Sequence, residues 1–167
     1  MPKVKNPSRR ADPRPSRKDI DKLVNLNSSL GYLLKEAHAA YTTALRRKLK
    51  SHGITLAQWY FLRELWQQEG LTQRQLSRRM KISEPTAATA LRLMEKRGLI
   101  YRDQNEKDLR GLHIFLTEKG RSLRDSVLAK VLTVNNEAAR GLSKGTIRKI
   151  QVGVQVMIDN LVHNGGD

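Results

Sequence analysis

Residues 71–98 carry the pattern that most constrains the fold of this chain: two short helices joined by a tight turn. Thr72 is followed three residues later by Gln75, a spacing that predicts a capping box and therefore a helix start. Ser83 is a good N-cap for the second helix, and Gly98 suits the position just after its end. The sequence therefore predicts a compact pair of consecutive helices.

The second of these helices, predicted from Glu84 to about Arg97, has two unlike faces. One face is apolar and is expected to point inward: Ala87, Ala90, Leu91 and Met94. The other face is small and polar, with one arginine: Glu84, Pro85, Ala88, Thr89 and Arg92. A helix buried only in a core does not need small residues outside, whereas a helix that enters a major groove does. This arrangement is typical of a helix-turn-helix.

Two predicted strands follow this helix directly, at residues 99–102 and 112–116, and a polar stretch joins them. A β-hairpin directly after a recognition helix is called a wing. Arg110, near its tip, is suited to a minor-groove or phosphate contact. Asp108 can pair with Arg110 and fix the direction of its guanidinium. The alternative is an exposed salt bridge in a turn, worth roughly 0–1 kcal/mol.

Positive charge is concentrated in two segments of a chain whose net charge is +16. Residues 1–18 carry seven basic groups against Asp12, and residues 71–102 carry eight against two glutamates. This excess favours a polyanionic partner, either nucleic acid or an anionic membrane, over a merely solvated surface. Residues 1–18, rich in proline, are expected to be a disordered basic arm that either follows phosphates or only aids solubility.

Several other classes of protein receive little support from the 167 residues. The chain has no cysteine, which removes disulfides and thiolate metal sites. Its four histidines, His38, His52, His113 and His163, are far apart and lack ligand-like spacing, so no metal is expected. No glycine-rich phosphate loop, nucleophile elbow, membrane-length apolar run or secretory signal is present. We expect no enzyme and no cofactor, and a cytoplasmic location.

Helical patterns flank the central block on both sides. Residues 19–52 are predicted to form one long helix with an apolar stripe, and residues 118–163 two further helices separated at Gly141. The last helix has a heptad-like apolar seam: Ile147, Ile150, Val154, Met157 and Leu161. Such seams at both ends suit a homodimer, while packing within one subunit is the alternative.

Taken together, these segments make the chain similar to the MarR family of bacterial transcriptional regulators. The similar stretches are I-T-L-A-Q-W-Y-F-L at 54–62, L-T-Q-R-Q-L-S at 71–77, M-E-K-R-G-L-I-Y-R at 94–102, D-L-R at 108–110 and L-T-E-K-G at 116–120. Their order and spacing are more specific than any single one. The resemblance implies a mainly α-helical, winged helix-turn-helix homodimer: dimerisation helices at 19–52 and 118–163 surround the winged helix-turn-helix at 54–117.

The resemblance also implies a repressor that leaves a palindromic operator on double-stranded DNA when it binds a small ligand, often a phenolic or aromatic acid. Residues predicted to contact DNA are Arg74, Arg78, Ser83, Pro85, Thr86, Ala88, Thr89, Arg92, Arg97, Asp108 and Arg110. Residues predicted to line an effector site are His38, Tyr41, Trp59, Arg63 and Trp66. The favoured alternative is that the two tryptophans pack in the core and that His38 only bonds to a neighbouring residue. The alternative function is an architectural, nucleoid-type DNA-binding protein without an effector.

Overall fold

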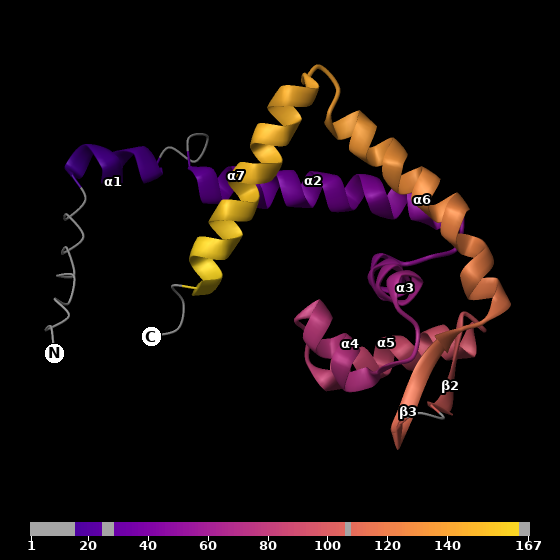
Figure 1. Ribbon diagram of the computed structural model, residues 1–167. Helices are drawn as coiled ribbons and strands as arrows, with labels where there is room; N and C mark the ends of the chain where they lie inside the picture. Colours follow the sequence, from indigo (N-terminus) through magenta and orange to yellow (C-terminus); the bar gives the residue numbers. More distant parts are fainter. Residues whose placement is uncertain (1–15, 25–28, 106–107, 164–167) are drawn as a thin grey trace, which may run out of the picture. The chain divides into compact units, whose positions relative to one another are not determined.

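The computed structural model describes the backbone of residues 16–24, 29–105 and 108–163, with all their side chains except those of residues 19, 22–24, 105, 108–111 and 163 (Figure 1). The elements in chain order are α1 (Arg17–Val24), α2 (Leu30–Lys50), α3 (Leu56–Gln67), β1 (Leu71–Thr72), α4 (Gln73–Met80), α5 (Glu84–Lys96), β2 (Ile100–Asn105), β3 (Asp108–Leu116), α6 (Glu118–Ala138) and α7 (Lys144–His163).

The chain divides into two compact units, residues 1–40 and 41–167. The first contains α1 and the beginning of α2, and its described apolar side chains Leu30 and Leu33 are exposed. The single helix predicted over residues 19–52 is wrong, because α1 ends at Val24 and α2 begins at Leu30. An apolar stripe identifies helical periodicity but does not register an interruption between two helices of similar pattern.

The predicted basic arm falls mostly on residues 1–15, which lie outside the described part of the chain. Its boundary at residue 18 is wrong, because Arg17 and Lys18 already belong to the first turn of α1. Two basic residues are unfavourable in the first turn of a helix, because the macrodipole favours anions there. The charge of residues 17 and 18 therefore did not predict a helix.

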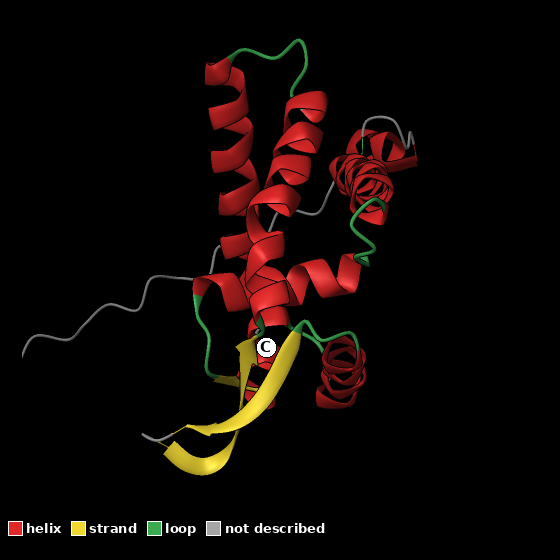
Figure 2. Ribbon diagram, turned by 90° about the vertical axis from the view of Figure 1, so that its right-hand side faces the viewer, coloured by secondary structure: helices red, strands yellow, loops and turns green. Residues whose placement is uncertain are grey.

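The second unit contains the predicted helix-turn-helix and hairpin, drawn in red and yellow in Figure 2. Hairpin strands β2 and β3 pair antiparallel, with Ile100 opposite Leu116 and Arg102 opposite Ile114. The sequence did not predict β1, two residues that pair with the other edge of β3 and complete a sheet of order β1-β3-β2. A strand this short carries no periodicity of its own, and it forms because Leu71 pairs with Ile114 in the core.

One hydrophobic core holds this unit together, and each element of the helix-turn-helix and wing contributes to it. Side chains with at most 1% of their surface exposed include Leu62 of α3, Leu76 of α4, Leu91 and Met94 of α5, and Ile114 of β3. Burying each such side chain stabilises the fold by about 1.5–3 kcal/mol. The predicted inward face of α5 is largely confirmed, since only Ala90 is half-buried rather than buried.

Candidate nucleic-acid interface

Contacts between residues close in the chain set the start of α4 and the turn into α5. The Thr72 hydroxyl accepts a hydrogen bond from the Gln75 backbone N–H at 3.2 Å, and the Gln75 side chain accepts one from the Thr72 N–H at 2.7 Å. This is the predicted capping box. Lys81 ends α4 in the left-handed region with φ 53°, which reverses the chain tightly. Helix α5 begins three residues later and therefore follows α4 closely.

Helix α5 begins as the sequence predicts. The Ser83 hydroxyl accepts a hydrogen bond from the Thr86 N–H at 3.3 Å, and Pro85 occupies the first turn, where it needs no donor. Gly98, with φ 65°, follows the end of the helix. The Ser83 cap and Pro85 therefore set the start of the helix locally.

Among the side chains predicted to meet the bases, Thr86, Thr89 and Arg92 are exposed, and Ala88 is half-buried. The Thr89 hydroxyl donates to the Pro85 carbonyl at 3.1 Å, which leaves its methyl group directed outward. Arg92 has no hydrogen bond or ion pair to any residue that the structure describes. The outward face of α5 thus presents small groups and one uncommitted guanidinium.

Strands β2 and β3 form the wing, which lies near α5 (Figure 1). A register irregularity between Gln104 and Asn105 marks its outer part. At its base the rings of Tyr101 and Phe115 stack with centroids 5.5 Å apart. Asp108 and Arg110 lie in β3, but the pairing predicted for them involves side chains outside the described set.

The arginines predicted to contact phosphates differ in their interactions within the protein. Arg78 is exposed, and Arg74 lies 3.8 Å from the Glu84 carboxylate. Arg97, by contrast, donates to the Gln58 side chain at 2.7 Å, and Gln58 also closes the capping box of α3. Arg97 therefore ties the end of α5 to the start of α3.

Sequence reasoning missed Arg102, which lies in β2. With Arg74, Glu84 and Leu112 it lines a cleft of about 460 Å³ between the wing and the helix-turn-helix. Its Nε is buried without a hydrogen-bond partner among the described residues, and it lies 3.7 Å from Glu95. The strand was predicted only from its apolar residues. That pattern does not indicate where the basic side chain of Arg102 lies.

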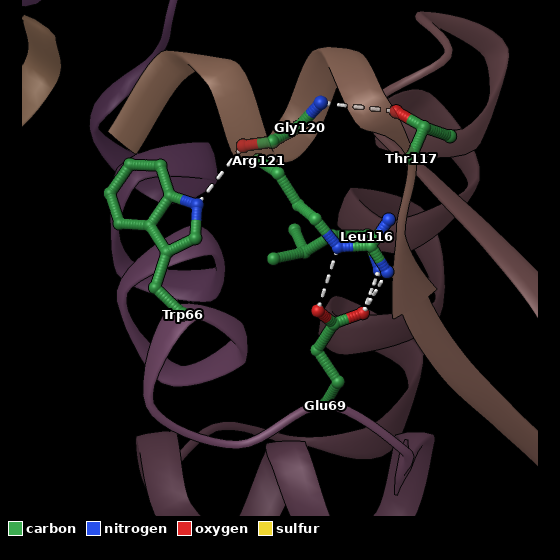
Figure 3. A network of polar contacts seen from close by, with 6 residues as sticks. All are labelled: Trp66, Glu69, Leu116, Thr117, Gly120 and Arg121. Carbon is green, nitrogen blue, oxygen red and sulfur yellow. Dashed lines mark hydrogen bonds and ion pairs between the residues drawn. The ribbon is translucent and has the colours of Figure 1, made fainter. Parts of the chain in front are cut away.

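A polar network joins α3, the end of the wing and α6 (Figure 3). Glu69 accepts two hydrogen bonds from the Arg121 guanidinium, at 3.0 and 2.8 Å, and a third from the Leu116 backbone N–H at 2.9 Å. The Trp66 indole donates to the Gly120 carbonyl at 3.0 Å. The hydrogen bond to Glu69 raises the pKa of Arg121 above its ordinary value. The start of α6 is thereby fixed to the base of the wing.

The first turn of α6 also holds the end of α5. The Thr117 hydroxyl donates to the Gly98 carbonyl at 2.6 Å, and the Lys119 ammonium donates to the Arg97 carbonyl at 2.9 Å. A Cβ at Gly120 would lie 2.1 Å from the Leu99 carbonyl oxygen, so only glycine permits this approach. Helix α6, the wing and the candidate recognition helix α5 are therefore connected at one junction.

The five residues predicted to line an effector site have different surroundings. Trp59 is only 4% exposed and belongs to the core, 6.0 Å from the Trp66 ring. Arg63 stacks on the Tyr60 ring, and His38 is exposed in the first unit. Tyr41 alone among them lines the large groove between α6 and α7, about 930 Å³ in volume.

Contacts between α2 and α6 stabilise one wall of that groove. The Tyr41 hydroxyl donates to the Asn135 side chain at 2.8 Å, and burial raises the pKa of Tyr41. Further along, Lys48 pairs with Glu137 at 2.9 Å and lowers the pKa of that carboxyl. Both contacts fasten the end of α6 to α2.

Other kinds of site receive no support from the described part of the chain. Residues 16–24, 29–105 and 108–163 contain no cluster of three His, Cys, Asp or Glu arranged to hold a metal. Within the same ranges, no helix combines the length and apolar character needed to cross a membrane.

Comparisons with known proteins agree with this geometry. A family model described as MarR family matches residues 54–112, from the start of α3 into the wing. The HTH-type transcriptional regulator TtmR of Methylorubrum extorquens is 33% identical over 100 residues, 60% of this chain. The match spans 51% of TtmR, about half its length.

Solved structures extend the likeness to the whole fold. The MepR–DNA complex of S. aureus is 26% identical with a TM-score of 0.72, over 81% of this chain and 98% of that one. CouR from Rhodococcus jostii, bound to p-coumaroyl-CoA, is 25% identical with a TM-score of 0.72, over 79% of this chain and 93% of that one. The matching family is one of regulators rather than enzymes. The chain belongs to the MarR family of DNA-binding transcriptional regulators and has their winged-helix fold.

Proposed function

We propose that this protein is a sequence-specific regulator that binds a palindromic operator in double-stranded DNA as a homodimer and represses transcription there. The observation that carries the proposal is the outward face of α5, where Thr86 and Thr89 are exposed beside the uncommitted Arg92. Arginine pairs with guanine in the major groove, and threonine methyls contact thymine methyls. Each such contact discriminates between bases by about 1–3 kcal/mol.

Phosphate contacts surround this reading face in the proposal. Arg74 and Arg78 on α4, with the wing residue Arg110, supply the cations. The MepR structure is of a DNA complex, and the similarity of its fold to this one supports DNA binding here.

The homodimer is supported by the surface of α7. Its apolar side chains are exposed on the single chain, up to 75% for Leu161: Ile150, Val152, Val156, Ile158, Leu161 and Val162. A monomeric protein rarely exposes so many large apolar side chains on one helix. A second copy that covers α7 would place two α5 helices for successive major grooves, about 34 Å apart.

Release by a small aromatic ligand is the second part of the proposal. CouR was solved with p-coumaroyl-CoA, a phenolic thioester. In this chain the groove of about 930 Å³ offers apolar walls and the Tyr41 hydroxyl, which suits a ring with one polar group. A ligand seated there would act on α6, which is connected to the wing through Glu69 and to the end of α5 through Thr117 and Lys119.

The experiment is a selection from genomic DNA. The purified protein is mixed with sheared DNA of its source organism at physiological salt, and the retained fragments are sequenced. Enrichment of a few palindromic sites supports the regulator. Uniform retention without a shared site refutes it and supports an architectural protein, whose binding rests on basic charge alone.

A further inference from the structure

The end of α2 carries basic residues on two sides, and only one side has acidic partners. On the first side Lys48 pairs with Glu137 at 2.9 Å, and Arg47 helps lower the pKa of the same carboxyl. On the other side Arg46 and Lys50, four residues apart and so on one face of the helix, are exposed. Neither has a hydrogen bond or ion pair with any residue in the described part of the chain.

Arg46 and Lys50 line a groove of about 430 Å³ whose floor is the turn into α3, from Gly53 to Leu56. The guanidinium of Arg97 borders this turn, since a Cβ at Gly53 would lie 3.1 Å from its Nη2. Three cations therefore surround the turn between α2 and α3.

This basic groove continues onto the candidate reading face. Thr55 lines it and also lines a second groove of about 410 Å³, whose far wall is the exposed side of α5 with Thr86, Thr89 and Leu93. Any polyanion that lies against α5 on this side passes Thr55 and meets Arg46 and Lys50 next. A DNA strand bordering the major groove that α5 enters is such a polyanion.

We propose that Arg46 and Lys50 form a second phosphate-binding surface, which holds the DNA backbone on the side of α5 opposite the wing. The surface is continuous with the proposed interface, and its charge is complementary to phosphate. It rests on the proposed function, because it extends the same DNA footprint. DNA would then be held on both flanks of α5: the wing and α4 on one side, the end of α2 on the other.

The test compares two charge-matched double variants on a site retained by the wild-type protein. The test variant is Arg46→Gln with Lys50→Gln. The control is Arg47→Gln with Arg140→Gln, which removes the same charge beside Glu137. Affinity is measured from low to high salt, and ethylation interference maps the phosphates that each variant binds. Thermal unfolding checks that each variant is folded.

The test variant is expected to bind on the order of tenfold more weakly than wild type. Its plot of log affinity against log salt should flatten by about 0.9 for each phosphate that it no longer neutralises. One cluster of interfering phosphates per half-site should disappear, while the control keeps the wild-type slope and pattern. An unchanged slope and pattern in the test variant, or an equal weakening in the control, would overturn the proposal.

Failure of the proposed function gives a different result. If wild-type protein retains no preferred site, sequence-specific regulation fails, and the two variants are then compared on nonspecific duplex. There the surface still predicts a flatter salt dependence for the test variant only, and equal slopes would overturn it.

Discussion

The carboxylate of Glu69, just after α3, receives both arms of the Arg121 guanidinium, at 3.0 and 2.8 Å, from a helix that begins 49 residues later in the chain. The same carboxylate accepts the Leu116 backbone N–H. One side chain therefore joins the helix that precedes the helix-turn-helix, the last residue of the wing and the first turn of α6 (Figure 3). The start of α6 is thereby connected to the wing by a single carboxylate.

Replacing Glu69 separates the two functions of its carboxylate. Glu69→Gln keeps an acceptor for the Leu116 N–H but loses the ion pair, which is partly exposed and therefore contributes little to stability. Glu69→Ala loses both and should destabilise the fold by about 1–2 kcal/mol. Urea unfolding of the two variants measures this difference. Equal unfolding free energies would contradict a role for the acceptor, and Arg124→Gln, at an exposed neighbouring pair, serves as the neutral control.

Gly120→Ala tests the close approach of α6 to the strand base. Its Cβ would meet the Leu99 carbonyl oxygen at 2.1 Å, a backbone atom that cannot move aside alone. We expect a loss of about 3 kcal/mol or more in the free energy of unfolding. Gly153→Ala in α7 is the matched control, since its Cβ would meet nothing within 4 Å, and it should stabilise the helix by about 0.5–1 kcal/mol. Similar unfolding midpoints for both variants would refute the packing described at Gly120.

Much of this fold follows from the sequence because its signals are local. Thr72, Ser83 and Thr117 cap helices where their residue types predict, and each cap needs only a neighbour three residues away. The strand pair of the wing follows from alternating apolar residues. The third strand and the division into α1 and α2 were missed, because both depend on residues distant in the chain or on a break that periodicity does not mark.

The candidate site was predictable where exposure follows helix periodicity, as for Thr89 and Arg92. Interactions between elements were not predictable. Arg97, expected at phosphate, is bonded to Gln58, which is 39 residues earlier. Trp59 faces the core although its spacing fitted a ligand site as well. Pairwise distances between elements decide these cases, and a single sequence does not contain them.

The pair between Lys48 and Glu137 predicts a pH dependence of stability. Lys48 lowers the pKa of the Glu137 carboxyl in the folded state, so the pair stabilises the fold above the ordinary carboxyl pKa. The stabilisation is lost as pH falls through the lowered pKa. Glu137→Gln should therefore unfold more easily than wild type near neutral pH, and the difference should shrink as the pH falls through the lowered pKa. Urea midpoints over a series of acidic pH values check this, and a difference that stays constant throughout the series would contradict it.

Arg110→Ala tests the wing. Because Arg110 is proposed to meet the minor groove or phosphate, its removal should weaken DNA binding sharply. The salt dependence should flatten by about 0.9 for each phosphate that the variant leaves unneutralised. Thermal unfolding should be unchanged, since Arg110 is near the tip of the hairpin. Unaltered affinity in a folded variant would remove Arg110 from the interface.

The central claim is that α5 reads base sequence, and Arg92→Ala tests it most directly. Affinity is measured at physiological salt for a selected operator and for a scrambled duplex of the same length and composition. The account predicts that Arg92→Ala reduces the difference between the two binding free energies by about 1–3 kcal/mol for each base that Arg92 reads, while binding to the scrambled duplex falls only slightly. A variant that keeps the wild-type ratio of affinities would contradict recognition by α5.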